Sequence, residues 1–167
     1  MKTLRKIYCR TFQTGLKIAL PFLPYRTPKV AGSVKALPKI IQKKNCRKVL
    51  IITDEGIRKL GLTLRLEKAL TDAKIPYCIY DKTVANPTTD NVAEAVRLYR
   101  KAGCDCIIGF GGGSSMDCAK AVGACIVKPK QSLKKMKGIL KVHKKLPLLM
   151  AVPTTAGTGS ETTLAAV

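Results

Sequence analysis

Tryptophan is absent from the chain, and aromatic residues make up only 5% of its 167 residues. Proteins that bind single-stranded nucleic acid usually stack the bases on aromatic side chains, so this chain is poorly supplied for that role. There is a single histidine, His143, which lies in a lysine-rich stretch and is expected in an exposed loop. Catalytic metal sites usually need several nitrogen or carboxylate ligands, so the chain alone is not expected to build a histidine-based site.

The seven cysteines follow no paired pattern. There is no C-x-x-C motif and no Cys/His cluster, and the count is odd. These features argue against a disulfide framework and against a structural zinc site. We expect most of the thiols to be buried and free in a reducing cytoplasm.

Acidic residues are scarce, with 10 Asp and Glu against 31 Lys and Arg, for a formal net charge of +21. Every residue before Asp54 is neutral or basic, and residues 128–145 contain eight lysines and no acid. Such an excess favours anionic partners: nucleotides, nucleic acid or an anionic membrane surface. The alternative is a solvated basic face whose balancing acids lie in a missing segment or in a partner.

The first 45 residues form a basic segment with no clean hydrophobic period. We expect a short helix at residues 4–20, a proline-broken connection, and a second helix at residues 37–44 with Pro38 in its first turn. The apolar patch at residues 16–23 contains Lys17 and Pro21 and is too short to span a bilayer. No transmembrane segment is therefore expected.

Apolar runs alternate with helical patterns from about residue 46 onward. Strands are expected at residues 48–53, 75–80, 105–110 and 147–152. Helices are expected at residues 55–73, 89–102, 115–126 and around 133–141. This alternation is typical of an α/β fold, a Rossmann-like parallel sheet flanked by helices.

A run of three glycines, Gly111, Gly112 and Gly113, lies where the third strand should turn into a helix. Glycines let the backbone approach a ligand closely, and a helix start offers free N–H groups, so together they favour a pyrophosphate cradle. Ser114 and Asp117 fit a variant of the capping box, with Ser114 as the N-cap. The match to the dinucleotide fingerprint is partial, and a tight strand–helix turn is the structural alternative. We favour a dinucleotide-binding domain over residues 46–167.

Two further polar features follow expected strands. Asp54 can accept hydrogen bonds from a ribose, or it can cap the helix that begins after it; spacing does not separate these roles. Residues 153–161 combine hydroxyls with two glycines and could close over a nucleotide or form a flexible turn. Asp54, the glycine run and this second loop all fall at carboxyl ends of strands, where α/β sheets bind ligands. We therefore expect one shared site.

Residues 111–120 (GGGSSMDCAK) and 151–161 (AVPTTAGTGSE) together resemble the iron-containing, or group III, alcohol dehydrogenases. The resemblance covers residues 48–167, and Asp54 and the Asn86-Pro87-Thr88 segment fit it as well. It implies that the glycine run and Ser114 hold the pyrophosphate of NAD, with NADP possible. It also implies four further contacts with the cofactor: Asp54 at the adenosine ribose, favouring NAD; Asn86 near the adenosine half; Asp117 on the nicotinamide side; and Thr154, Thr155 and Thr158 from the second loop.

The same resemblance implies an iron site, held by one aspartate and three histidines in an all-helical domain that is absent from this sequence. Iron or zinc is expected only with that domain, so we expect the chain alone to be inactive. In a full-length form it would act on a small alcohol or aldehyde and form a homo-oligomer. Two other hypotheses remain open: a non-catalytic nucleotide-binding module, and a basic protein that binds nucleic acid or a membrane surface.

Overall fold

The computed structural model describes residues 10–11, 14–15, 28–136, 141–142 and 144–160. Residues 1–30 and 31–167 form two compact units, and the helices and strands given below belong to the second. Within the helix expected at residues 4–20, the four described residues are helical, and His143 lies outside the described residues. None of the helices in the described ranges is long and apolar enough to cross a membrane. The domain boundary expected at residue 45 stays a prediction.

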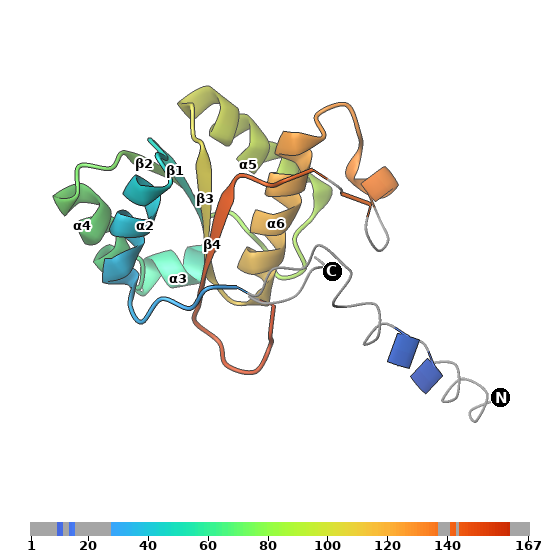
Figure 1. Cartoon of the computed structure of the whole chain (residues 1–167), viewed down its shortest axis with the longest axis horizontal. Helices are drawn as coiled ribbons and strands as arrows, with labels where there is room; N and C mark the ends of the chain where they lie inside the picture. Colours follow the sequence, from blue (N-terminus) through green and yellow to red (C-terminus); the bar gives the residue numbers. More distant parts are fainter. Residues whose placement is uncertain (1–9, 12–13, 16–27, 137–140, 143, 161–167) are drawn as a thin grey trace. The chain divides into compact units, whose positions relative to one another are not determined.

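Four parallel strands form one sheet in the order β2-β1-β3-β4 (Figure 1). The strands are β1 (Val49–Ile52), β2 (Tyr77–Tyr80), β3 (Cys106–Gly111) and β4 (Leu148–Pro153). All residues of the two central strands, β1 and β3, are buried, as expected when helices cover both faces of a sheet. The α/β, Rossmann-like fold and the four expected strands are confirmed.

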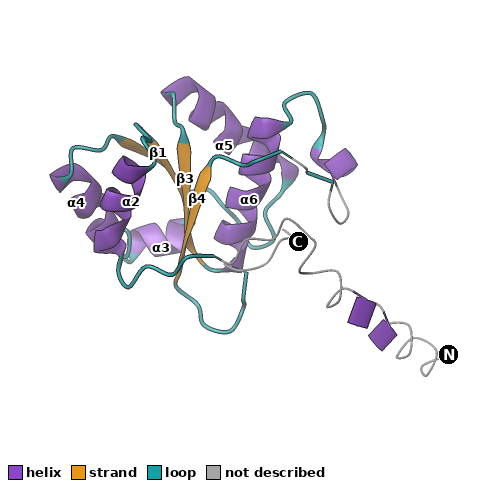
Figure 2. Cartoon of the chain, in the orientation of Figure 1, coloured by secondary structure: helices purple, strands orange, loops and turns teal. Residues whose placement is uncertain are grey.

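The helices lie on both faces of the sheet (Figure 2); η2 and α2 precede β1, and the others lie in the connections between consecutive strands. They are η2 (Val34–Ala36), α2 (Leu37–Lys43), α3 (Glu55–Lys59), α4 (Leu64–Asp72), α5 (Thr89–Ala102), α6 (Gly113–Val127) and η3 (Leu133–Met136). The single helix expected at residues 55–73 is instead two helices, because Gly61 adopts the left-handed conformation (φ +64°) and ends the first. The helix expected around residues 133–141 is a 3₁₀ turn over its first four residues, and residues 137–140 lie outside the described ranges.

The core has two parts because side chains alternate between the two faces of each strand. On one face, Leu50 and Ile52 of β1 pack with α5 and α6. On the other face, Val49 and Ile51 pack with α2 and α4. These four side chains are fully buried, so β1 joins the two layers and holds the carboxyl end of the sheet in place.

Candidate functional site

The polar loops predicted to share a site meet at the carboxyl ends of β1, β3 and β4. The register of β3 and β4 places Gly111 opposite Pro153, and the Thr154 N–H donates a hydrogen bond to the Gly111 carbonyl at 2.9 Å. This bond extends the pairing of the two strands by one residue beyond the sheet. The glycine run and the second loop are therefore adjacent, as the sequence predicted.

The glycine run forms the turn from β3 into α6. Gly111 has φ +139°, and a Cβ there would lie 2.7 Å from Ser115 Oγ and 3.2 Å from Asp54 Oδ2. Only glycine fits this position without strain, because both the backbone conformation and the space exclude a side chain. Gly112 is the N-cap of α6, and no side chain caps the helix, so the first-turn N–H groups have no side-chain acceptor at the N-cap.

The predicted capping box of Ser114 and Asp117 is wrong. Helix α6 begins at Gly113, so Ser114 lies inside the first turn rather than at the N-cap. The Ser114 hydroxyl instead accepts a hydrogen bond from the Asn86 N–H at 3.3 Å. The Asp117 carboxylate forms an ion pair with Lys120 at 3.4 Å, with both side chains at least 84% buried. The extended backbone of Gly112 can begin the helix without a side-chain cap, and this shifts the start earlier than the serine pattern suggests.

Asp54 serves as the N-cap of α3. Its Oδ1 accepts a hydrogen bond from the Ile57 N–H at 2.9 Å, which confirms the structural role that the sequence left open. Its Oδ2 accepts a hydrogen bond from the Ser115 hydroxyl at 3.4 Å. Asp54 thus contacts the glycine turn directly, and its predicted contact with a ribose stays a prediction.

Asn86 comes to the same turn from the loop between β2 and α5. It adopts a left-handed conformation (φ +55°), which asparagine tolerates better than most residues. This conformation directs its N–H to Ser114, so an exposed loop is fastened to the first turn of α6. The structure therefore places Asn86 beside the first turn of α6, whereas its predicted position near the adenosine half of the cofactor stays a prediction.

The second loop lies against the glycine turn through two of its side chains. A Cβ on Gly112 would be 3.6 Å from both the methyl and the hydroxyl of Thr155, and a Cβ on Gly113 would be 3.6 Å from Ser160 Oγ. The Thr158 and Ser160 hydroxyls are hydrogen-bonded at 3.0 Å. Thr158 is therefore linked to the turn through Ser160, whereas Thr155 borders it directly.

Two serines lie at this site that the sequence analysis did not predict as site residues. Ser115 is buried and hydrogen-bonded to Asp54, and Ser160 of the second loop lies beside Gly113. Both belong to the polar motifs already noted. In the sequence analysis this helix begins at Ser115, whereas α6 begins at Gly113. A start at Gly113 would have predicted that the Ser115 hydroxyl faces the interior of the domain. The role of Ser160 depends on how the second loop folds, and no local pattern indicates that.

Two buried ionisable groups, Cys118 and Tyr80, are unsuited to act as bases or nucleophiles. Burial raises the pKa of the Cys118 thiol in α6 to about 11, although the Thr83 hydroxyl partly offsets this. Burial also raises the pKa of Tyr80, at the end of β2, to about 12. Both groups stay protonated at neutral pH, so neither acts as a base or nucleophile there.

The donor set at the turn does not make an iron site. Its two carboxylates, Asp54 and Asp117, already have hydrogen-bond or ion-pair partners. The described residues include no imidazole, since the only histidine lies outside them. A dinucleotide fits better, because close-approach glycines, uncapped helix N–H groups and hydroxyl-bearing loops all surround one turn.

Comparison with known proteins agrees with this geometry. A family model described as iron-containing alcohol dehydrogenase matches residues 26–167. The probable alcohol dehydrogenase EutG of Escherichia coli K12 is 37% identical over 132 residues, covering 79% of this chain and 33% of that protein. The NAD-dependent methanol dehydrogenase of Bacillus methanolicus is 33% identical over 146 residues, covering 87% of this chain and 38% of that protein.

A solved structure, that of a 1,3-propanediol oxidoreductase, superimposes with a TM-score of 0.77 at 33% identity. The match covers 83% of this chain and 37% of the oxidoreductase. The chain thus spans about a third of the length of the relatives it matches.

Proposed function

Because this chain belongs to the iron-containing alcohol dehydrogenase family, we propose that it is the NAD-binding part of an alcohol dehydrogenase. The observation that carries the proposal is the junction of the two loops. The bond from Thr154 to Gly111 holds the second loop beside a helix start that no side chain caps. Such a start combines N–H donors with the positive end of the helix dipole, which favours a pyrophosphate.

The residues of the chain bind and orient the cofactor in this proposal. Gly112, Gly113 and Ser114 present their N–H groups to the pyrophosphate, and Gly111 keeps the approach free of a side chain. The adenosine half lies toward Asp54 and Asn86, and the nicotinamide side toward Asp117. Three hydroxyls of the second loop border the nucleotide, those of Thr154, Thr155 and Thr158. When bound, NAD supplies the hydride chemistry, and the protein supplies position and electrostatics.

Full-length members would pair this part with a metal and a small alcohol or aldehyde. The donors at the turn do not fit iron, so no step of the reaction is assigned to a metal held by these residues. In this proposal the residues at the turn hold and orient the dinucleotide. The alcohol itself, and any assembly into oligomers, belong to the full-length form.

The first prediction is that the purified 167-residue chain binds NADH but does not oxidise alcohols. NADH fluorescence measures binding, and absorbance of NADH formed from NAD with ethanol or 1,3-propanediol, with and without added Zn²⁺ or Fe²⁺, measures turnover. Binding without turnover is expected, because the glycine turn fits a dinucleotide, whereas the donors at that turn do not fit iron. Alcohol oxidation by this chain would overturn the assignment of inactivity.

Salt dependence distinguishes this proposal from nucleic-acid binding. A hollow of about 950 Å³ between η2–α2 and α4 is lined by four cationic side chains and one acid, namely Lys35, Lys39, Arg65, Lys68 and Asp72. Binding of a nucleic acid through such lysines would fall steeply with salt. NADH binding in the glycine turn should change much less. Tight, salt-sensitive binding of random DNA with no binding of NADH would replace the dehydrogenase proposal with the nucleic-acid one.

Asp54→Ser is expected to raise the affinity for NADPH relative to NADH by about tenfold or more, since a carboxylate within about 4 Å of a 2′-phosphate costs over 1 kcal/mol. Serine is also a preferred N-cap residue, so it can keep the hydrogen bond to Ile57 and preserve α3. The variant thus removes the charge and retains the cap. Competitive titration of the two cofactors measures the ratio.

The matched control for this substitution is Asp72→Ser, which removes an exposed carboxylate in the last turn of α4. Its NADPH/NADH ratio should equal that of the unmodified chain. An unchanged ratio in Asp54→Ser would place the ribose elsewhere, whereas a changed ratio in both variants would indicate a general charge effect.

A further inference from the structure

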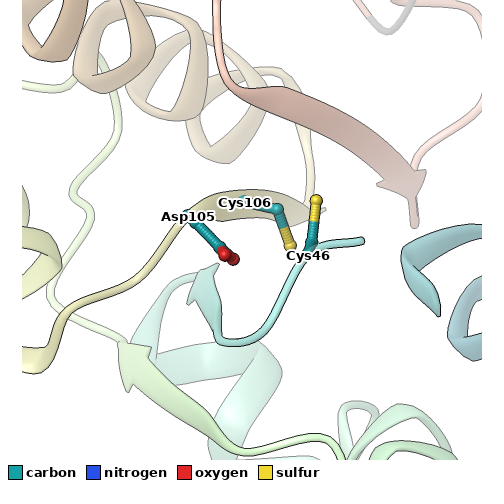
Figure 3. Close-up of side chains that lie close together, drawn as sticks. All are labelled: Cys46, Asp105 and Cys106. Carbon is teal, nitrogen blue, oxygen red and sulfur yellow. The ribbon is translucent and has the colours of Figure 1, made fainter. Parts of the chain in front are cut away.

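Three side chains with metal-ligating atoms gather at the edge of the sheet opposite the glycine turn. Cys46 lies in the connection before β1, and Asp105 and Cys106 lie at the start of β3 (Figure 3). Their sulfur and carboxylate oxygen atoms all lie within 4.8 Å of one another. Because β1 and β3 are parallel neighbours, this edge holds their amino-terminal ends. The proposed dinucleotide site does not use these residues.

The Asp105 carboxylate is held in place by the backbone of the neighbouring strand start. The Arg47 N–H donates to both carboxylate oxygens at 2.9 and 3.0 Å, and the Lys48 N–H donates to Oδ1 at 3.0 Å. The Arg47 side chain approaches Oδ2 only at 3.6 Å and is 90% exposed, so it can move aside at little cost. Oδ2 therefore remains available to a further cation.

Burial and neighbouring acidic groups favour the protonated forms of the two thiols, and the nearby positive charge offsets this only in part. Burial raises the pKa of Cys106 well above its ordinary value, and Cys46 and Asp105 raise it further. Burial and the Asp105 carboxylate also raise the pKa of Cys46, which Cys106 and Lys44 lower only in part. A divalent cation would reverse this balance, because it stabilises thiolates and carboxylate together.

We propose that Cys46, Cys106 and Asp105 form a structural site for a thiophilic divalent cation of the zinc class. Two thiolates and one carboxylate oxygen suit zinc and cadmium, whereas magnesium and calcium prefer oxygen ligands throughout. A water molecule completes four-coordination. Each thiol releases one proton as its sulfur binds the metal, and no electron is transferred.

The geometry requires only a modest closing of the cluster. Ligands of a tetrahedral zinc ion lie about 3.5–3.8 Å apart, so the group must contract by about 1 Å. Cys46 can make this movement because it is half-buried and lies in a connection rather than in a strand. The bound ion would tie the segment between α2 and β1 to the start of β3. It would strengthen the fold without taking part in hydride transfer.

The test is a titration of the reduced 167-residue chain with Cd²⁺, followed through the ultraviolet thiolate-to-metal charge-transfer band. Zn²⁺ competition against a chromophoric chelator gives the affinity and the stoichiometry. We expect one metal per chain and a rise in Tm of about 5 °C or more at saturating Zn²⁺. Both signals should disappear in Cys46→Ser, which changes a half-buried side chain outside the regular elements. Absence of the band in the unmodified chain would overturn the proposal.

The matched control is Cys78→Ser. Cys78 and Cys104 form a second close thiol pair, with their sulfur atoms 3.3 Å apart on the other face of the sheet. Cys78→Ser should keep the metal signals, whereas Asp105→Asn should weaken them. If Cys46→Ser retained the metal, or if Cys78→Ser lost it, the cation would bind elsewhere and the assignment to Cys46, Asp105 and Cys106 would be wrong.

Discussion

Replacing Gly112 by alanine is expected to weaken NADH binding by about ten- to hundredfold. This fold-change corresponds to the loss of one or two charge-assisted hydrogen bonds, which together contribute about 1.5–3 kcal/mol. The fold should survive the change. Gly112 has φ −83°, which any residue adopts, and the added Cβ meets only Thr155, at the ordinary contact distance of 3.6 Å. The methyl group would instead occupy the space through which the pyrophosphate reaches the first turn of α6. Fluorescence titration and thermal unfolding measure the two effects separately.

Gly123→Ala is the control, because Gly123 lies on the same helix and away from its start. A Cβ there would meet Leu146 at 3.6 Å, again an ordinary contact. Alanine inside a helix is favoured over glycine by about 0.5–1 kcal/mol, so stability should rise slightly and NADH affinity should not change. Unaltered NADH binding in Gly112→Ala would show that the phosphates do not approach the helix at this residue.

Gly111→Ala is expected to destabilise the chain by about 3 kcal/mol or more, since a strained backbone costs about 1–3 kcal/mol and overpacking adds about 1–3 kcal/mol. Both costs apply at this position. Gly111 has φ +139°, and its Cβ would overlap Ser115 Oγ at 2.7 Å and approach Asp54 Oδ2 at 3.2 Å. Native domains are stable by only about 5–15 kcal/mol, so this loss is a large fraction of the total. Urea unfolding measures it directly.

Two companion variants separate the backbone cost from the overlap. Gly103→Ala places a side chain at another left-handed position, φ +67°, where a Cβ would meet no atom within 4 Å. Its expected cost is the conformational part alone, about 1–2 kcal/mol. Adding Ser115→Ala to Gly111→Ala should recover only part of the loss, because the backbone strain remains. Equal stability losses in Gly111→Ala and Gly103→Ala would show that the overlap relaxes without cost.

The bounds of a helix were predicted correctly where the sequence carries both a start signal and a stop signal. Helix α5 spans Thr89–Ala102 as expected, since Thr88 and Asn91 form a capping box at its start and Gly103 ends it in the left-handed conformation. The prediction of one helix at residues 55–73 was wrong. Gly61 adopts the left-handed conformation and ends the first of two helices, although the helical pattern continues past it. A glycine in a helical pattern costs only about 1 kcal/mol, so sequence does not decide whether the helix continues or ends there.

The start of α6 shows why local capping patterns can mislead. The serine-to-aspartate spacing suggested a cap at Ser114, yet the helix begins at Gly113. Partners from distant segments decide the outcome: Asn86 donates to Ser114, and Asp54 accepts from Ser115. These contacts join residues far apart in the chain, so no pattern within a few residues contains them.

The sequence by itself determined the fold class, the family and the general position of the candidate site. Buried apolar runs alternating with helices require a covered parallel sheet, and parallel strands bring their carboxyl ends to one edge. Only the tertiary structure decided which groups meet there and at the opposite edge. It placed Ser160 beside Gly113 and brought Cys46 close to Asp105 and Cys106. The physical reason is that strand register and loop path set such contacts, and both depend on the packing of the whole domain.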